Sequence, residues 1–299
     1  MTTETIINTA VPIAVFIMMF ALGTGLTFND FRRALERPKA LLIGLSTQIV
    51  AVPIMGVLFV SMQTLDAEVA LGIVILALCP GGAMSNVLTR IAGGDVALSV
   101  SLTAVTNLLS VATLPILTLL AVSHFLGNVV DRVDIQEVTK RVVFVVTIPV
   151  VLGTLLRHFA PGVILRQEKR IFSLSLAVFI LIIGWAMVES SEILFAGLFL
   201  LGWQLTFLIV LLTGLGFLAG TLFGTSSSQR TTLALETGVQ NSGLGLAAAA
   251  MLSVDPASFP VSAVPSVVYS ALIYTFLFPV VLWLSHRKRR ACTSEKTGG

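Results

Sequence analysis

Charged side chains are scarce in this sequence, since Asp, Glu, Lys and Arg make up only 11% of its 299 residues. A soluble globular domain carries about 25% charged residues, so this composition argues against a soluble protein. Hydrophobic residues reach 56%, and the mean hydropathy is +0.99. The sequence therefore predicts an integral membrane protein.

Cysteine and histidine are also rare. The two cysteines, Cys79 in an apolar run and Cys292 in the terminal tail, exclude a disulfide framework. The three histidines, His124, His158 and His286, fall at the ends of apolar runs or in loops. Because no phosphate loop, zinc-ligand spacing or nucleophile elbow appears either, we do not expect an enzyme.

Long apolar runs recur along the whole chain, which favours transmembrane helices over short alternating barrel strands. A helix of about 20 residues crosses the hydrocarbon core. On that measure the sequence predicts about nine spans, at residues 6–28, 39–62, 68–92, 95–124, 139–157, 170–189, 193–224, 229–252 and 260–285.

Positive charge gathers in alternate loops. Most of the 18 Lys and Arg residues lie in 29–39, 157–170 and the tail 286–299, whereas most acids fall at the opposite ends of the spans. The positive-inside rule then predicts an outside N-terminus and a cytoplasmic C-terminus, as in a multi-pass inner-membrane protein. Because the basic residues serve this topology, the net charge of +3 does not indicate a nucleic-acid partner.

Glu236 is the only acid well inside a predicted span, in the stretch 235–245, LETGVQNSGLG. An ionisable group at membrane depth is costly and usually marks an ion pathway or relay. A protonated Glu236 that donates a hydrogen bond to a neighbouring helix is the structural alternative.

The third and eighth predicted spans each contain a break, at CPGGAMSN (79–86) and at LETGVQNSGLG. Pro80 removes a backbone donor, and glycine tolerates non-helical dihedral angles. Paired interrupted helices in corresponding halves of a membrane protein indicate a transporter with an inverted repeat and a binding site at the breaks. Two kinked structural helices are the alternative.

Hydroxyl side chains line one face of the next span, at Ser99, Thr103, Thr106 and Ser110. Thr106 and Ser110 are interpreted as contacts between helices, and Ser99 and Thr103 as oxygen ligands near the first break. Carboxylate, amide and hydroxyl oxygens suit a hard cation. Sodium is the first candidate, and a proton on Glu236 is the second.

Two segments, CPGGAMSNVLTRIAGGDVALSVSLT and ETGVQNSGLG, resemble the bile acid:sodium symporter family, in particular its bacterial members. The similarity extends from GTGLTFNDFRRALERPKA to AVPSVVYS. It implies one transporter domain over 1–299, with panel and core domains related by inverted repeats and two discontinuous helices crossing in the core. We expect panel helices in 1–62 and 139–189, core helices in 68–124 and 193–285, and a cytoplasmic basic tail in 286–299. Many bacterial relatives have ten spans, and the nine predicted here match the layout of the animal relatives.

The resemblance also implies two sodium sites that share Glu236. The first comprises Ser85, Asn86, Ser99, Thr103 and Glu236. The second comprises Gln48, Glu236, Gln240 and the backbone carbonyls of Thr237 and Val239. The sequence alone also allows a second role for Gln48, in which its side chain forms a hydrogen bond to a neighbouring helix and binds no ion.

The resemblance places the substrate beside the crossover, in contact with Asn241. Two positions depart from the relatives that bind bile acids: Ala83 stands where they have threonine, and Ile273-Tyr274 where they have a His-Asn pair. The implied substrate is therefore a bile acid-like or smaller organic acid, such as pantoate, ketopantoate or another 2-keto or hydroxy acid.

The sequence thus predicts sodium-coupled import of an organic anion by alternating access, with two sodium ions per substrate. The alternative is proton-coupled efflux, as in the related arsenite exporters, with Cys79 as a possible arsenite ligand. The lipid bilayer and the anion are the expected partners, and the oligomeric state stays open, a monomer included.

Overall fold

The structure is a computed structural model, and it describes residues 10–25, 38–125, 140, 143–189, 191–250, 252, 260–279, 281–282 and 285. Nearly all of these residues are helical, and none of them belongs to a named β-strand. The all-α fold is therefore confirmed. The basic tail 286–299 and most of the basic loop 29–39 lie outside the described residues, so the orientation in the membrane stays a prediction.

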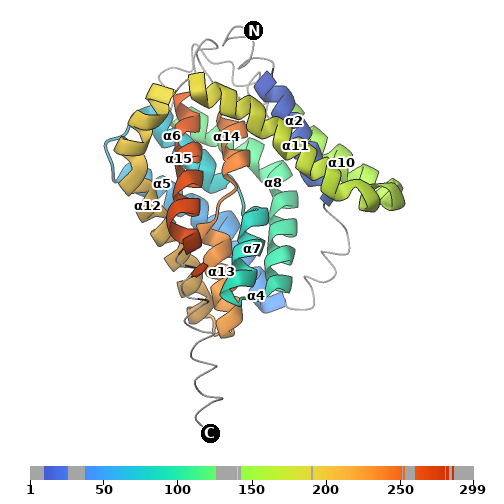
Figure 1. Ribbon diagram of the computed structural model, residues 1–299. Coiled ribbons are helices and arrows are strands. Elements are labelled where there is room, and N and C mark those ends of the chain that lie inside the picture. The colour runs from blue at the N-terminus through green and yellow to red at the C-terminus, as the bar shows by residue number, and fades with distance from the viewer. Residues whose placement is uncertain are drawn as a thin grey trace.

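The described helices follow one another along the chain as Figure 1 labels them. They are α2 (Val11–Gly25), α4 (Pro38–Ser46), η2 (Thr47–Ala51), α5 (Val52–Ser61), α6 (Ala67–Leu78), α7 (Ala83–Ala92), α8 (Val96–Phe125), η4 (Val143–Thr147), α10 (Ile148–Phe159), α11 (Pro161–Glu189), α12 (Ser191–Leu222), α13 (Ser227–Gly238), α14 (Ser242–Ala250), η5 (Val261–Ala263), α15 (Val264–Leu272) and η6 (Ile273–Leu277).

Three of the described helices are long and apolar enough to cross a bilayer: Pro38–Ser61, Val96–Phe125 and Phe195–Leu222. The predicted third and eighth spans are each split into two halves, and no half is longer than 12 residues. Several predicted spans extend into residues that the structure does not describe, so the count of nine stays a prediction.

Three π-helical turns widen these helices, and each turn ends two residues before a proline. They are η2 before Pro53, η4 before Pro149 and η6 before Pro279. Proline has no N–H and cannot bond the carbonyl four residues earlier. At η2 the N–H of Val52 bonds the carbonyl of Thr47, five residues back. This wider turn carries Gln48, and π-turns of this kind often occur at functional sites.

Helix α6 lies at the centre of the hydrophobic core, because all of its residues from Ala70 to Ala77 are buried. It contacts α5, α8, α14, α15 and η5. A helix that is apolar on every side is expected in such a central position. Helix α6, the half of the first broken helix that precedes the break, is therefore surrounded by protein.

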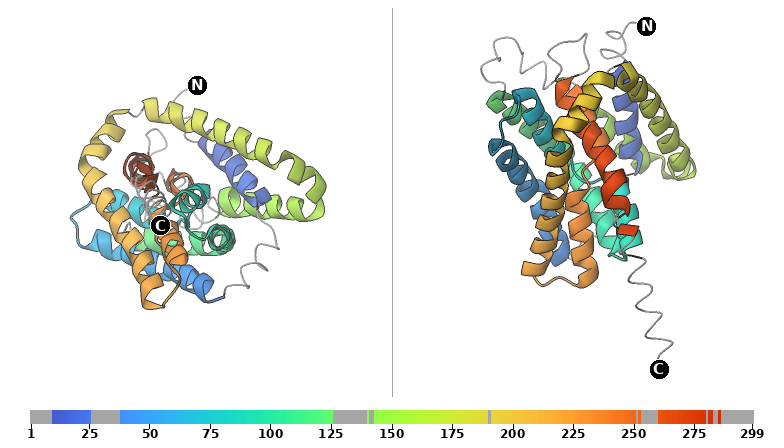
Figure 2. Two further views of the ribbon diagram at one scale, coloured as in Figure 1. Left: turned by 60° about the horizontal axis from the view of Figure 1, so that its bottom comes forward. Right: turned by 60° about the vertical axis from the view of Figure 1, so that its left-hand side comes forward.

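A second group of helices, α2, α10 and α11, lies to one side of this core (Figure 1). Helix α2 approaches α10 closely at Gly23, where a β-carbon would lie 2.3 Å from the Val150 carbonyl oxygen. Small residues at such crossings let two backbones come together in a membrane. From this group α11 runs along the periphery to α12, as Figure 2 shows.

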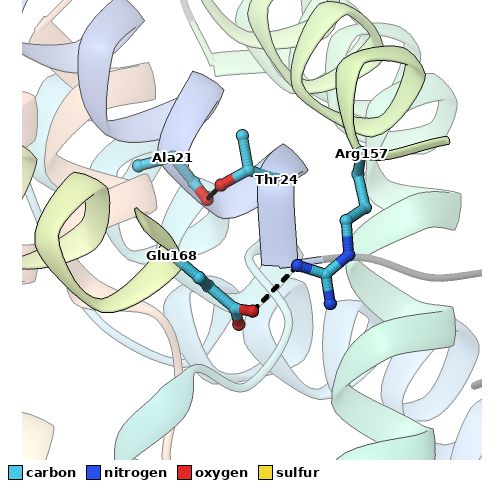
Figure 3. Close-up of polar contacts among 4 residues, drawn as sticks. All are labelled: Ala21, Thr24, Arg157 and Glu168. Atoms are coloured by element: carbon cyan, nitrogen blue, oxygen red, sulfur yellow. Dashed lines mark hydrogen bonds and ion pairs between the residues drawn. The ribbon is translucent and has the colours of Figure 1, made fainter. Parts of the chain in front are cut away.

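One ion pair ties the start of α11 to the end of α10. Arg157 donates to Glu168 at 2.9 Å, close to the end of α2, where the Thr24 hydroxyl donates to the Ala21 carbonyl at 2.7 Å (Figure 3). The side chain of Arg157 is 12% exposed and that of Glu168 is 39% exposed. The pair is therefore partly screened by solvent.

Helix Pro38–Ser61 lies within residues 1–62, which the sequence analysis assigned to the panel. Its α4 part contacts α8, α12 and α13, and its α5 part contacts α6 and α12. The reason is that Leu41 and Ile43 pack with Leu98, Leu102 and Leu233 in a second buried apolar cluster. We use the name panel group for α2, η4, α10 and α11 and the name core group for the other described helices; the assignment of residues 1–62 to a panel domain stays a prediction.

Candidate functional site

The two breaks meet at a crossover in the core. Gly81 and Gln240 form an isolated antiparallel β-bridge, and the Asn241 N–H donates to the Pro80 carbonyl at 3.1 Å. These contacts satisfy backbone groups that the broken helices leave open. A β-carbon at Gly81 would lie 2.9 Å from Glu236 Oε2, so a residue with a side chain would press on the carboxylate.

The Glu236 carboxylate lies beneath this bridge and is only 5% exposed. Its Oε1 accepts a short hydrogen bond from Ser99, and its Oε2 accepts one from Thr103 at 3.0 Å. Both donors lie on α8, more than 130 positions away in sequence. No basic side chain within the described ranges forms an ion pair with Glu236.

Asn86 on α7 completes this first cluster. Its Oδ1 lies 2.7 Å from the Ser99 hydroxyl and 3.4 Å from the Thr103 hydroxyl. Ser99 and Thr103 each have one hydroxyl proton, whereas Glu236 and Asn86 present three acceptor oxygens to them. The two hydroxyl protons of Ser99 and Thr103 cannot satisfy all three oxygens, and a bound cation would balance the buried negative charge.

Ser85 is fully buried beside this cluster. Its hydroxyl donates to the Gly82 carbonyl at 2.7 Å, and its Oγ lies 3.3 Å from the position of a β-carbon at Gly81. It therefore lies next to the Glu236 carboxylate at the first turn of α7.

A second polar cluster lies between η2 and the break after α13. Gln48 Nε2 donates to Gln240 Oε1 at 3.0 Å, and Gln240 Nε2 donates to the Thr237 carbonyl at 2.6 Å. Gln48 Oε1 is buried and has no hydrogen-bond partner among the described residues. A cation bound here could be coordinated by Gln48 Oε1, by the Gln240 amide oxygen and by backbone carbonyls at the break.

Of the two residues expected to contribute backbone carbonyls, Thr237 contacts this cluster, since its carbonyl accepts from Gln240; the role of the Val239 carbonyl stays a prediction. The Thr237 hydroxyl lies 2.9 Å from the Leu212 carbonyl on α12 and 2.8 Å from the Leu233 carbonyl of its own helix. Val239 is 2% exposed and has left the helical conformation, with φ −108° and ψ 87°. Helix α13 therefore ends one residue before Val239.

The four predicted substrate residues have different surroundings. Asn241 caps α14, since its Oδ1 accepts from the Leu244 N–H at 3.1 Å, and it lies beside Gly82. Ala83 is the first residue of α7. Ile273 is 3% exposed within the core, whereas the neighbouring Tyr274 is 55% exposed. Asn241 and Ala83 thus lie at the crossover, and Ile273 and Tyr274 face in different directions from η6.

Tyr269 contacts the second break, and the sequence analysis did not single it out. It is fully buried on α15, and its hydroxyl donates to the Gly238 carbonyl at 2.9 Å. A tyrosine within an apolar run signals such a contact, because a buried phenol needs a hydrogen-bond partner. Cys79, in contrast, is fully buried in the hydrophobic core beside the first break.

Comparison with known proteins adds the family. The Sodium Bile acid symporter family matches residues 12–197. The "Uncharacterized sodium-dependent transporter YocS" of Bacillus subtilis is 30% identical over 271 residues, which cover 88% of this chain and 79% of the relative.

Two eukaryotic relatives are similar over comparable stretches. The "Probable sodium/metabolite cotransporter BASS1, chloroplastic" of Oryza sativa is 31% identical over 84% of this chain, and the match spans 61% of the plant protein, less than two thirds of its length. The "Ileal sodium/bile acid cotransporter" of Homo sapiens is 28% identical over 80% of this chain and 68% of its own length. This chain therefore belongs to the sodium bile acid symporter family, and it is a multi-pass membrane transporter rather than an enzyme.

Proposed function

We propose that this chain imports an organic anion together with sodium ions, by alternating access. One observation carries the proposal: the Glu236 carboxylate is buried among the neutral oxygens of Asn86, Ser99 and Thr103 and has no basic partner in the described structure. The printed names of the bacterial, plant and human relatives, each a sodium-dependent transporter or cotransporter, support it.

The composition of the cluster favours a monovalent cation. Glu236 is its one carboxylate, and Asn86, Ser99 and Thr103 supply neutral oxygens. Calcium takes six to eight oxygen ligands, commonly from several carboxylates. The described residues contain no group of three or more His, Cys, Asp or Glu side chains that could hold a metal ion. Sodium, carried as a substrate, suits such a site better.

A second sodium ion at Gln48, Gln240 and the carbonyls of Thr237 and Val239 completes the proposal. Glu236 belongs to both proposed sites, and residues 237–240 directly after it supply ligands to the second, so an ion at the first site orders the start of the segment that the second site uses. Binding that removes conformational freedom at one site reduces the cost at the next. We therefore expect cooperative activation by sodium, with two ions per substrate.

The anionic substrate binds beside the crossover. Helices α7 and α14 both begin there, and helix N-termini favour negative charge. Asn241 and Ala83 lie at these two starts. The proposed substrate is a bile acid-like or smaller organic acid. We favour a small 2-keto or hydroxy acid, such as pantoate or ketopantoate, because apolar Ile273 is buried in the core.

Alternating access uses the two groups of helices. The panel group touches the remaining helices through a few pairs, α2 with α14, η4 with α8 and α11 with α12. The core group contains both broken helices, so it carries the bound ions when it moves against the panel. The N-terminus lies outside and the tail 286–299 in the cytoplasm, at the inner membrane.

The test is uptake by proteoliposomes under an inward sodium gradient, screened across bile acids and small 2-keto and hydroxy acids. Replacing sodium by choline should abolish accumulation. Glu236→Gln should raise the sodium concentration for half-maximal uptake at least about tenfold, since each 1.4 kcal/mol of lost binding is a factor of ten. Glu192→Gln, at an exposed acid on α12, is the matched control and should behave like the wild type.

Two results would contradict the proposal. The first is uptake that responds to a proton gradient and ignores sodium. The second is sodium-dependent uptake that is equal in Glu236→Gln and Glu192→Gln.

A further inference from the structure

Tyr269 is the largest fully buried side chain in the described structure, and neither proposed sodium site includes it. Its hydroxyl reaches from α15 to the Gly238 carbonyl, the last carbonyl of α13. The last four carbonyls of an α-helix have no partner within the helix. The tyrosine thus satisfies one of these carbonyls where water is excluded.

Helix α12 confines the same residue from a second direction. A β-carbon at Gly238 would lie 2.0 Å from the Thr213 hydroxyl oxygen, so only glycine fits between α12 and α13. The hydroxyl of the preceding residue, Thr237, lies 2.9 Å from the Leu212 carbonyl on α12 and 2.8 Å from the Leu233 carbonyl of its own helix. The end of α13 is therefore held between α12 and α15.

This anchoring determines which carbonyls remain for an ion. The Tyr269 hydroxyl donates to the carbonyl of Gly238, which is the last residue of α13 and lies between Thr237 and Val239. The carbonyls on either side belong to Thr237 and Val239. In this cluster the Thr237 carbonyl accepts a hydrogen bond only from the Gln240 side-chain amide, and Val239 lies in the break. The Gln240 amide belongs to the proposed site and can be displaced by a cation, whereas the Tyr269 phenol belongs to a separate helix, α15.

We propose that Tyr269 is a positioning residue for the second sodium site: by holding the Gly238 carbonyl, it orients the Thr237 and Val239 carbonyls toward the ion. Tyr269 does not itself bind sodium. This inference rests on the proposed sodium-coupled transport.

The variant that tests it is Tyr269→Phe, which keeps the ring in the core and removes only the hydroxyl. The substitution leaves the buried Gly238 carbonyl without the phenol donor, and an unpaired buried carbonyl is costly. We expect the sodium concentration for half-maximal uptake to rise about three- to thirtyfold. The sodium Hill coefficient should fall toward one, because the first site keeps all its ligands.

The substrate side should respond differently. At saturating sodium, the KM for the anion should stay within about twofold of wild type, a difference worth less than 0.5 kcal/mol. The matched control is Ser270→Ala on the same helix, since Ser270 donates only to the Val267 carbonyl of its own turn, at 2.9 Å. It should leave the sodium curve unchanged. A second readout is thermal unfolding in detergent, where sodium should stabilise the wild type and Ser270→Ala more than Tyr269→Phe.

The outcomes separate this inference from the proposed function. A wild-type protein with no sodium dependence overturns the proposed function. A sodium-dependent wild type, with Tyr269→Phe showing the same sodium curve, overturns only the role of Tyr269. The role of Tyr269 is also overturned if Tyr269→Phe fails to fold, or if it raises the KM for sodium and the KM for the substrate equally. Either result would assign the hydroxyl to general stability.

Discussion

At the scale of single residues, the most informative feature is a buried carboxylate whose neighbours are oxygens. The sequence predicted Glu236 and its partners Asn86, Ser99 and Thr103, and the structure brings their side chains within hydrogen-bonding distance. The polarity of these residues within apolar runs is what made them visible. Tyr269 was missed because its hydroxyl is part of a large apolar side chain, and its partner is a backbone carbonyl.

Gly81→Ala should severely impair sodium-dependent uptake. The new β-carbon would lie 2.9 Å from Glu236 Oε2 and 3.3 Å from Ser85 Oγ, so the carboxylate must move away from Ser99 and Thr103. We expect the sodium requirement to rise about tenfold or more, as a loss of 1.4 kcal/mol gives. Uptake at graded sodium concentrations measures this. Gly214→Ala is the control, because its β-carbon meets no atom within 4 Å; an equal effect of both substitutions would contradict the expectation.

At the scale of helices, prolines explain where the regular pattern changes. The sequence predicted the breaks at Pro80 and at the glycines of 238–245, because these residues disfavour a helix locally. It did not predict the three π-turns, although Pro53, Pro149 and Pro279 follow them at the same spacing. The sequence shows that proline lacks an N–H, so one backbone hydrogen bond of the helix is lost. Which group then donates to the carbonyl left without a partner depends on the neighbouring helices.

Pro115 within α8 leads to a prediction at this scale. Its missing N–H leaves the Val111 carbonyl free, and the Thr147 hydroxyl at the end of η4 donates to that carbonyl at 2.9 Å. Thr147→Val removes the donor and keeps the shape, so we expect a loss of about 1–3 kcal/mol in the free energy of unfolding. Reversible unfolding in detergent measures it. Thr221→Val, whose exposed hydroxyl bonds within α12, should change stability by less, and the reverse order would contradict this.

The ion pair between α10 and α11 should contribute little. Glu168 is 39% exposed, and partly solvated pairs are worth about 0–1 kcal/mol. Glu168→Gln should therefore lower the unfolding free energy by no more than about 1 kcal/mol, and molar salt should remove the difference. Unfolding curves at low and high salt test this, and a larger loss that persists in salt would show that the pair is effectively buried.

At the scale of the whole molecule, hydropathy does not reveal which helices pack together. Pro38–Ser61, part of the stretch 1–62 that was predicted to belong to the panel, packs with α6, α8, α12 and α13, and the panel assignment stays a prediction. The apolar faces of membrane helices look alike in sequence, since lipid and protein neighbours are equally apolar. The grouping is therefore decided by side-chain fit between helices.

Transport with two sodium ions and one monovalent anion should be electrogenic. Each cycle would carry one net positive charge inward, so an inside-negative potential of 100 mV should contribute about 2.3 kcal/mol. That corresponds to about a fiftyfold higher accumulation ratio at equilibrium. Potassium diffusion potentials set with valinomycin in proteoliposomes measure this. Accumulation that does not change with potential would exclude this stoichiometry for a monovalent substrate.

The sequence by itself determined the class of protein, the helical character, the positions of both breaks and the polar residues beside them. These follow from composition and from residues close together in the chain, where hydropathy and backbone preferences act. Only the tertiary structure decided that Glu236 meets Ser99 and Thr103, more than 130 positions away, that Gln48 pairs with Gln240, and that Tyr269 holds Gly238. Such contacts depend on how helices pack, and packing depends on the shape of every neighbouring side chain at once.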